Sequence, residues 1–142
     1  MDTSAAPDAE VRDERQATLL ALVDAENRLD LDAITALFPV PRYELIGTNK
    51  VYEGIDAVTR YLRERRAAFP DLRIELVTFH HADDALIAEF WLTGTHLGVI
   101  EGITPTGRAF RCRMAGFFLF EGTRLTCERI YFDNGTIARQ LA

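Results

Sequence analysis

The spacing of apolar residues changes at Pro70, and this change constrains the fold more than any other feature of the sequence. On the N-terminal side of Pro70, apolar positions recur with the period of a helix. On the C-terminal side they alternate with polar positions, as on a strand that has one buried face. Helices followed by an antiparallel sheet predict an α+β fold, in which the helices cover one face of the sheet.

The N-terminal half is expected to contain helices at 10–29, 31–38 and 55–69. Asp30 precedes the second helix, where an aspartate side chain can cap free backbone amides. Thr48 and Asn49 suit a tight turn between two short strands, which are expected at 43–47 and 50–53. Longer strands are expected after Pro70, at 72–80, 85–96, 108–120 and 124–132.

The chain has 142 residues, which is enough for one domain with a single core. We assign this domain to residues 10–142 and expect residues 1–9 to form a flexible tail. The net charge is −6, and neither a basic face nor a basic tail offsets it, so we expect no nucleic-acid or membrane partner. The acidic N-terminus does not resemble a signal peptide. We therefore expect a cytoplasmic protein in which Cys112 and Cys127 are reduced, buried thiols.

The last two strands predict which side chains share the apolar face of the sheet. A two-residue turn centred on Glu121 and Gly122 would pair Phe120 with Thr123 and place Asp133 opposite Phe110. The same face would then hold Cys112, Met114, Phe118, Leu125, Cys127, Arg129 and Tyr131. The neighbouring strand would add Leu86, Ala88, Phe90, Leu92 and His96. A register slipped by one residue would instead move Asp133 to the charged face, and it separates polar from apolar residues less well.

Two interpretations of Asp133 stay open. Among apolar side chains its carboxyl would be poorly solvated, which raises the pKa and allows proton exchange near neutral pH. Alternatively, Asp133 caps a short C-terminal helix through the amides of Gly135 or Thr136. His96 also has two interpretations. It either holds a bend by forming a hydrogen bond with a backbone carbonyl, or it is an orienting or protonating partner of Asp133 in catalysis.

The opposite face of the sheet mixes apolar and charged side chains. We expect a homodimer through this face, with an interface formed by Trp91, Phe79, Arg111 and Arg113. The charge run at 63–66 on the third helix is interpreted as a solvated helix face. Three scattered histidines without ligand spacing do not predict a metal site.

Four motifs occur in a characteristic order: FPD at 69–71, GTHLG at 94–98, GITPTGR at 102–108, and a terminal aspartate, Asp133, followed by RQLA at 139–142. In these motifs the sequence resembles the SnoaL-like polyketide cyclases of the nuclear-transport-factor-2-like superfamily. The resemblance extends over about residues 10–142.

The resemblance implies a cone-shaped α+β barrel, in which a curved antiparallel sheet wraps around three N-terminal helices and encloses one apolar pocket. It implies chemistry without a cofactor, in which Asp133 acts as acid and base in the intramolecular aldol closure of a polyketide ester. His96 is the histidine of the GTH motif. Arg129 departs from the family, which often has an aromatic residue there. On the pocket side, its guanidinium would suit an anionic or carbonyl-rich ligand.

The leading hypothesis is therefore a cyclase or isomerase that acts on a hydrophobic or aromatic carbonyl compound. Asp133 and His96 would be catalytic, and Arg129 and Tyr131 would polarise the carbonyl or place the ring. The walls of the binding site would be Phe110, Cys112, Met114, Phe90 and Leu92. A second hypothesis is an epoxide-hydrolase-like or dehydratase-like enzyme of the same fold. A third is a non-catalytic module for ligand binding or dimerisation.

Overall fold

The computed structural model describes residues 8–142, so most of the tail expected at 1–9 lies outside the described residues. Asp8 caps the first helix by accepting a hydrogen bond from the amide of Val11 at 2.9 Å. The helices are α1 (Ala9–Arg28), α2 (Leu31–Leu37), α3 (Ile55–Ala68) and α4 (Asn134–Leu141). Asp30 caps α2 as predicted, through the amide of Ala33. Within this range, none of the helices is both long and apolar enough to cross a membrane.

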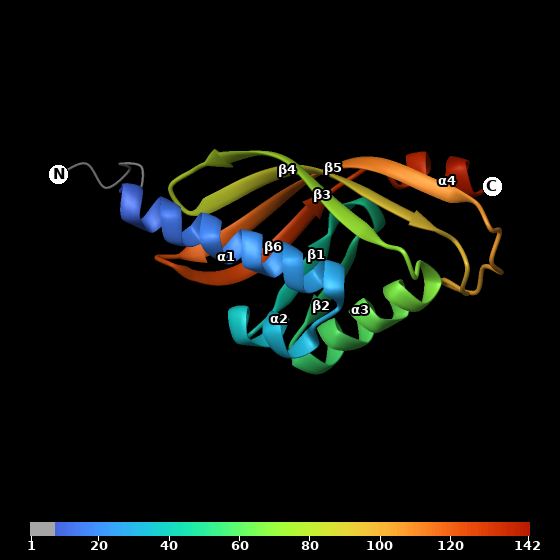
Figure 1. Ribbon diagram of the computed structural model, residues 1–142, viewed down its shortest axis with the longest axis horizontal. Coiled ribbons are helices and arrows are strands. Elements are labelled where there is room, and N and C mark those ends of the chain that lie inside the picture. The colour runs from blue at the N-terminus through green and yellow to red at the C-terminus, as the bar shows by residue number, and fades with distance from the viewer. Residues whose placement is uncertain (1–7) are drawn as a thin grey trace.

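The strands form one curved sheet in the order β2-β1-β6-β5-β4-β3. They are β1 (Arg42–Leu45), β2 (Lys50–Glu53), β3 (Arg73–His81), β4 (Ala85–Thr95), β5 (Ala109–Glu121) and β6 (Arg124–Tyr131). Neighbouring strands are antiparallel except β1 and β6, which are parallel. Figure 1 shows α1, α2 and α3 on one side of the sheet, with α4 near the C-terminus. The predicted α+β class and the curved sheet are confirmed, and the sheet is antiparallel except for the parallel pair of β1 and β6.

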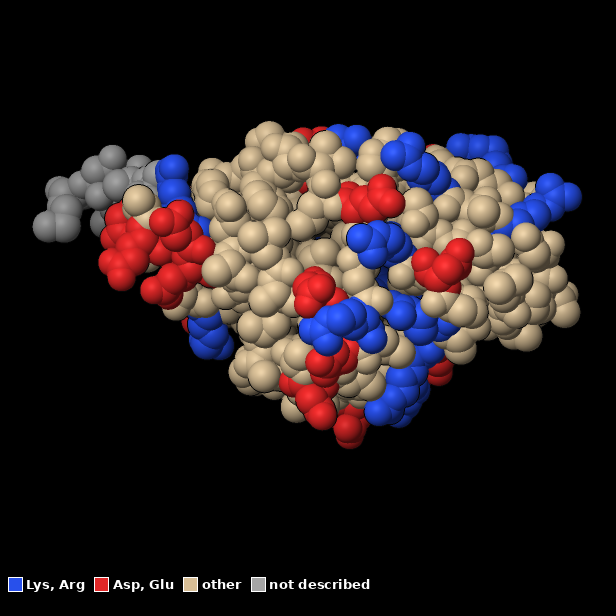
Figure 2. All heavy atoms as spheres, in the orientation of Figure 1, with Lys and Arg blue, Asp and Glu red and all other residues tan. Residues whose placement is uncertain are grey.

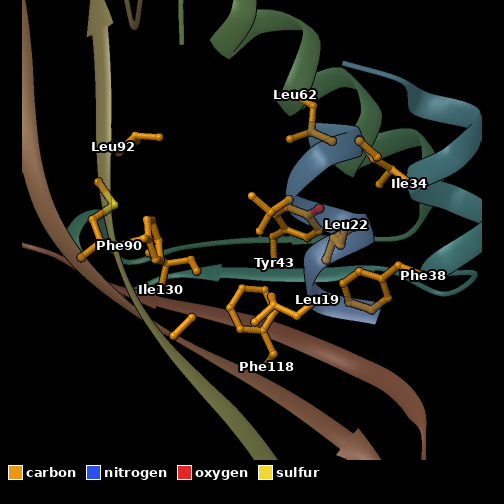
Figure 3. Packing of buried hydrophobic residues seen from close by; sticks show 14 of the residues in the cluster. Leu19, Leu22, Ile34, Phe38, Tyr43, Leu62, Phe90, Leu92, Phe118 and Ile130 are labelled. Carbon is orange, nitrogen blue, oxygen red and sulfur yellow. The ribbon is translucent and has the colours of Figure 1, made fainter. Parts of the chain in front are cut away.

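The core lies between α1, α2, α3 and the inner face of the sheet. Leu19 and Leu22 of α1 pack with Phe38 and Tyr43 against Phe118 of β5 (Figure 3). All five side chains are at most 2% exposed, and burying each of them contributes about 1.5–3 kcal/mol relative to an exposed side chain. The even-numbered residues of β4 and β5 face this core, as their alternation predicted.

The register of the last hairpin differs from the prediction in two ways. The turn is centred on Gly122 and Thr123, so Glu121 pairs with Arg124. A β-bulge follows: Phe120 pairs with Leu125 and Leu119 with Cys127, which leaves Thr126 without a partner residue of its own. The Thr126 hydroxyl donates a hydrogen bond to the Leu119 carbonyl at 3.1 Å and so holds the bulge in place.

A second bulge lies in β3 at Val77, between the pairs Leu76–Phe90 and Thr78–Glu89. It reverses the alternation beyond Val77, so Phe79 packs against the core rather than on the outer face. The expected place of Phe79 in a dimer interface was therefore wrong. Trp91, Arg111 and Arg113 do lie together on the outer face, with the Arg111 guanidinium 3.7 Å from the centre of the indole ring.

Charged side chains of both signs share the surface. Figure 2 shows acidic side chains gathered at the N-terminal end of α1, while the rest of this view mixes Lys and Arg with Asp and Glu. No extended basic patch is visible on this face of the described chain.

Candidate functional site

A pocket of about 490 Å³ lies between the inner face of the sheet and the helices. The sheet contributes apolar walls from β4, β5 and β6: Phe90, Leu92, Phe110, Met114 and Ile130. The helices contribute Tyr61 from α3 and Ile137 and Leu141 from α4. Such a lining, mostly apolar with few polar groups, is typical of a small-molecule site.

Among the acidic and basic side chains of this lining, three lie close together, each from a different element. They are Glu26 of α1, Arg65 of α3 and Glu128 of β6. Glu26 is 2% exposed and Glu128 is 5% exposed. Arg65 Nη2 lies 3.4 Å from Glu26 Oε1 and forms an ion pair with it. We call these three residues the buried charge cluster.

Burial raises the pKa of the Glu128 carboxyl well above its ordinary value, and the nearby Glu26 carboxylate raises it further. The pKa of Glu26 is also raised by burial, against the opposing effect of the Arg65 guanidinium. The ion pair with Arg65 stabilises the charged form of Glu26. Glu128 is therefore the carboxyl of this cluster that more readily keeps a proton. A carboxyl that holds its proton toward neutral pH can donate it to a ligand and take it back.

The local structure explains how each carboxyl reaches the pocket. In α1, Glu26 follows Leu19, Leu22 and Val23 on the same helical stripe, which faces the core. In β6, the bulge at Thr126 shifts the alternation by one residue. Glu128 and Ile130 consequently point inward, and the outward positions fall to their neighbours.

Asp133, the predicted acid and base, does not lie on the pocket side. Its side chain is 68% exposed and caps α4, accepting hydrogen bonds from the Thr136 hydroxyl at 2.8 Å and the Gly135 amide at 3.1 Å. These two hydrogen bonds, the Thr136 bond first, lower the pKa of its carboxyl. The placement on the apolar face was wrong, and the capping interpretation describes the observed geometry.

Arg129 and Tyr131 were also placed on the wrong face, for the same reason. The bulge directs both side chains to the outer side of the sheet. Arg129 Nε lies 3.0 Å from Glu44 Oε1 on β1, and Tyr131 is 43% exposed with its ring in a T-shaped contact with Phe117. The guanidinium that lines the pocket is Arg65, which belongs to the charge run expected to be solvated.

The remaining predicted site residues divide into two groups. Phe90, Leu92, Phe110 and Met114 line the pocket, and their contact with a substrate stays a prediction. Cys112 is buried but lies outside the pocket lining, with its Sγ 4.0 Å from the carbonyl oxygen of Asp133.

His96 is fully buried, and its ring binds the loop that follows it. The amide of Thr106 donates a hydrogen bond to His96 Nδ1 at 3.3 Å. The predicted bond to a backbone carbonyl is replaced by this bond to a backbone amide. His96 is not among the residues that line the pocket.

The loop at 97–108 and strand β2 also contribute to the lining of the pocket. Val99, Ile100 and Ile103 of the loop contribute apolar contacts. Lys50 of β2 and Glu101 of the loop form an ion pair. The Lys50 ammonium is therefore already compensated by a carboxylate.

The fold and the site together define an α+β protein with a small-molecule pocket inside a curved sheet. The sequence model of the family described as "SnoaL-like polyketide cyclase" matches residues 16–141. The chain therefore belongs to the SnoaL-like polyketide cyclase family, as its motifs suggested. No curated protein matches the sequence.

Solved structures agree with this fold. TsrD from Streptomyces laurentii superimposes with a TM-score of 0.77 at 22% identity, covering 92% of this chain and 96% of that one. IdmH from Streptomyces antibioticus, a suggested polyketide cyclase, gives 0.75 at 24% identity, covering 89% and 97%. An NTF2-like protein from Burkholderia thailandensis gives 0.74 at 19% identity, covering 91% and 97%.

Proposed function

We propose that this protein is a cyclase or isomerase that needs no cofactor and acts on a hydrophobic carbonyl compound, with Glu128 as the group that moves the proton. The observation that carries the proposal is a carboxyl, 5% exposed, that lines an apolar pocket. Its raised pKa gives it the proton affinity that general acid–base catalysis requires. Membership of the cyclase family supports the reaction class.

The proposed reaction begins with the ionised form of Glu128. Its carboxylate takes a proton from the carbon next to the substrate carbonyl, the C–H bond breaks, and the electron pair forms an enolate. In a cyclisation, the enolate carbon then bonds to a second carbonyl carbon of the same molecule. The alkoxide formed there takes the proton back from Glu128. In an isomerisation, Glu128 returns the proton to another carbon instead.

Arg65 has a supporting role in this proposal. Its guanidinium lines the same end of the pocket as Glu128, and within residues 8–142 its Nε has no hydrogen-bond partner. A fixed positive charge in a water-poor site stabilises a developing enolate oxygen more than water would. Arg65 thus takes the polarising role that the sequence assigned to Arg129.

Hydrogen–deuterium exchange tests the proposal without knowledge of the natural substrate. In D₂O, the wild-type protein should accelerate exchange of the hydrogens next to the carbonyl of 2-tetralone or 1-indanone, followed by NMR. Glu128→Gln should reduce this acceleration by about 100-fold or more, because amides do not transfer protons near neutral pH. Asp133→Asn should retain the wild-type rate, because asparagine also caps helices.

Two results would overturn the proposal. One is exchange no faster than in buffer with both ketones. The other is an unchanged rate in Glu128→Gln that has the circular dichroism spectrum of the wild type. Either result would favour a non-catalytic binding module.

A hydrolytic reaction is a second candidate, and the Glu26–Arg65 ion pair favours it. A carboxylate beside a guanidinium, with a protonated Glu128 nearby, could activate water against an epoxide while Glu128 protonates the opening oxygen. Incorporation of ¹⁸O from labelled water into the diol of styrene oxide tests this candidate. Glu26→Gln should abolish the incorporation.

A further inference from the structure

The buried charge cluster is one positive charge short of neutrality when both carboxyls are ionised. It holds the two carboxyls of Glu26 and Glu128 and the single guanidinium of Arg65. Lys50 also lines the pocket, but Glu101 forms an ion pair with it and compensates its charge. A buried carboxylate without a compensating charge is costly, so Glu128 either keeps a proton or requires a cation from elsewhere.

We propose that the pocket binds a ligand with a basic nitrogen on an aromatic or other apolar body, and that the protonated nitrogen lies beside Glu128 and replaces its proton. This inference deepens the proposed function, because it relies on the same carboxyl and names a class of ligand for the same pocket. It does not require that the ligand react.

Unpartnered acceptor atoms at this end of the pocket match an ammonium group. Among residues 8–142, the buried atoms here without a hydrogen-bond partner are two acceptors, Glu26 Oε2 and Glu128 Oε2, and two donors, Arg65 Nε and the Tyr43 hydroxyl. An ammonium group offers only donors, so it can satisfy both oxygens. A carboxylate or phosphate on the ligand would offer only acceptors and would add a further negative charge beside them.

The aromatic walls also favour a cation with an apolar body. Tyr61 stacks on Tyr52 with 4.4 Å between ring centres, and both line the pocket. The Arg65 guanidinium already lies 5.3 Å from the centre of the Tyr61 ring. Such ring faces attract cations, while the apolar residues of the sheet receive the rest of the ligand.

The charge of the whole lining points in the same direction. Six acidic or basic side chains line the pocket: Glu26, Glu64, Glu101, Glu128, Lys50 and Arg65. Four are carboxyls and two are cations, and each cation already has a carboxylate partner. The sequence suggested an anionic ligand, because Arg129 was expected to face the pocket. Among these residues, however, no cation is free to pair with an anionic ligand.

Binding by this route has a proton balance that can be measured. The amine arrives as an ammonium ion, and below its raised pKa the Glu128 carboxyl holds its proton. When the ammonium–carboxylate pair forms, the Glu128 O–H bond breaks and that proton passes to the buffer. The groups that face Glu128 and set this balance are Glu26 of α1, Tyr61 and Arg65 of α3, and Tyr43 of β1.

Calorimetric titration with three ligands of similar size tests the proposal. They are 2-naphthylmethylamine, 2-naphthylmethanol and 2-naphthoate, titrated just below neutral pH in PIPES and in ACES, whose heats of ionisation differ. The amine should bind at least about tenfold more tightly than the alcohol, and the carboxylate most weakly. The two buffers should report the release of about one proton per amine bound and none for the alcohol.

Two variants locate the effect in the cluster. Glu128→Gln should bind the amine and the alcohol with similar affinity and release no proton. Glu26→Gln should also lose the preference for the amine, because Arg65 then neutralises Glu128 without a ligand. Glu75→Gln, an exposed position on β3, is the matched control and should bind like the wild type.

The proposal is wrong if the amine binds no more tightly than the alcohol, if it binds without proton release, or if both cluster variants keep the preference. These outcomes are independent of the proposed function. Loss of the amine preference with intact ketone exchange would overturn only this proposal. Amine binding with proton release but no exchange would overturn only the proposed reaction.

Discussion

The carboxyl of Glu128 lies in surroundings that disfavour its charged form. Because its pKa is raised in the folded protein, the folded state keeps a proton that the unfolded state releases above about pH 4.5. Stability should therefore fall as the pH rises from there up to the folded-state pKa. A difference of one bound proton changes the free energy of unfolding by about 1.4 kcal/mol per pH unit.

Glu128→Gln should remove this slope. Urea unfolding at a series of pH values from 5 upward should show the variant gaining stability relative to the wild type as the pH rises. The difference between the two proteins cancels contributions from other carboxyls that both share. Glu75→Gln should follow the wild-type curve. A constant offset between Glu128→Gln and the wild type would mean that Glu128 is ionised in the folded protein.

Asp133 is a carboxylate of the opposite kind, because the Thr136 hydroxyl and the Gly135 amide stabilise its charged form. Asp133→Ala should lower the thermal midpoint through loss of the α4 cap, whereas Asp133→Asn should change it little. In the wild type, the contribution of this cap should be present above the ordinary pKa near 3.8 and should be lost as the pH falls through the lowered value. Equal effects of alanine and asparagine would contradict the capping role.

At the scale of elements, the loop at 97–108 is held closed at its base. The amide of His96 donates to the Arg108 carbonyl and the amide of Gly107 to the His96 carbonyl, both at 2.9 Å. The amides of Leu97 and Gly98 donate to the Ala68 carbonyl at the end of α3. This base positions the loop residues that line the pocket.

Gly98→Ala should disrupt the hydrogen bonds that hold the two ends of this loop and attach it to α3. A Cβ atom built on Gly98 would lie 2.2 Å from the carbonyl oxygen of Ala67, closer than any real contact. The loop or the end of α3 must then shift, at an expected cost of about 3 kcal/mol, and the pocket should lose ligand affinity. Gly102→Ala is the control, since its Cβ meets no atom within 4 Å, and it should cost about 1 kcal/mol through its positive φ alone. Urea unfolding measures both, and similar costs would refute the argument from close approach.

The sequence predicted these elements well, because periodicity and caps are local signals. Asp30, Gly54 and Pro70 mark element boundaries that the structure confirms to within a residue or two. The even-numbered residues of β4 and β5 face inward as predicted, because neither strand contains a bulge between the predicted positions. Strand alternation is reliable wherever the ladder is regular.

The candidate site was predicted only in part, because a β-bulge has no local signature in this sequence. The extra residue Thr126 moved Arg129, Tyr131 and Asp133 off the inner side and placed Glu128 there. Beyond the bulge, β6 turns the same side chains inward as the register slipped by one residue would, although the residues that it pairs are different. Glu26 could have been found, since it continues the apolar stripe of Leu19, Leu22 and Val23. A carboxylate on a buried helical stripe indicates a partner, and Arg65 is that partner.

At the scale of the whole molecule, the outer face of the sheet is the surface that the helices leave uncovered. Trp91, Phe117 and Tyr131 give it an apolar centre around the small residue Ala115. Charges of both signs surround this centre, including Arg113 paired with Glu89 at 3.5 Å. A surface with an apolar centre and both signs of charge can be complementary to a second copy of itself about a two-fold axis.

A homodimer through this face should therefore form in solution, and Ala115→Arg should disrupt it. The new side chain can extend into solvent from a monomer, so folding should be unaffected, but between two sheets it would be buried without room or compensation. Light scattering after size exclusion should give twice the chain mass for the wild type and the single chain mass for the variant. Leu20→Arg, at a position 46% exposed on α1, is the control for a charge placed on an exposed apolar residue, and it should stay dimeric. A monomeric wild type would mean that no such dimer forms, and an Ala115→Arg variant that is still dimeric would mean that the interface lies elsewhere. In either case Trp91 would be exposed to solvent and covered only by Arg111 and Arg113.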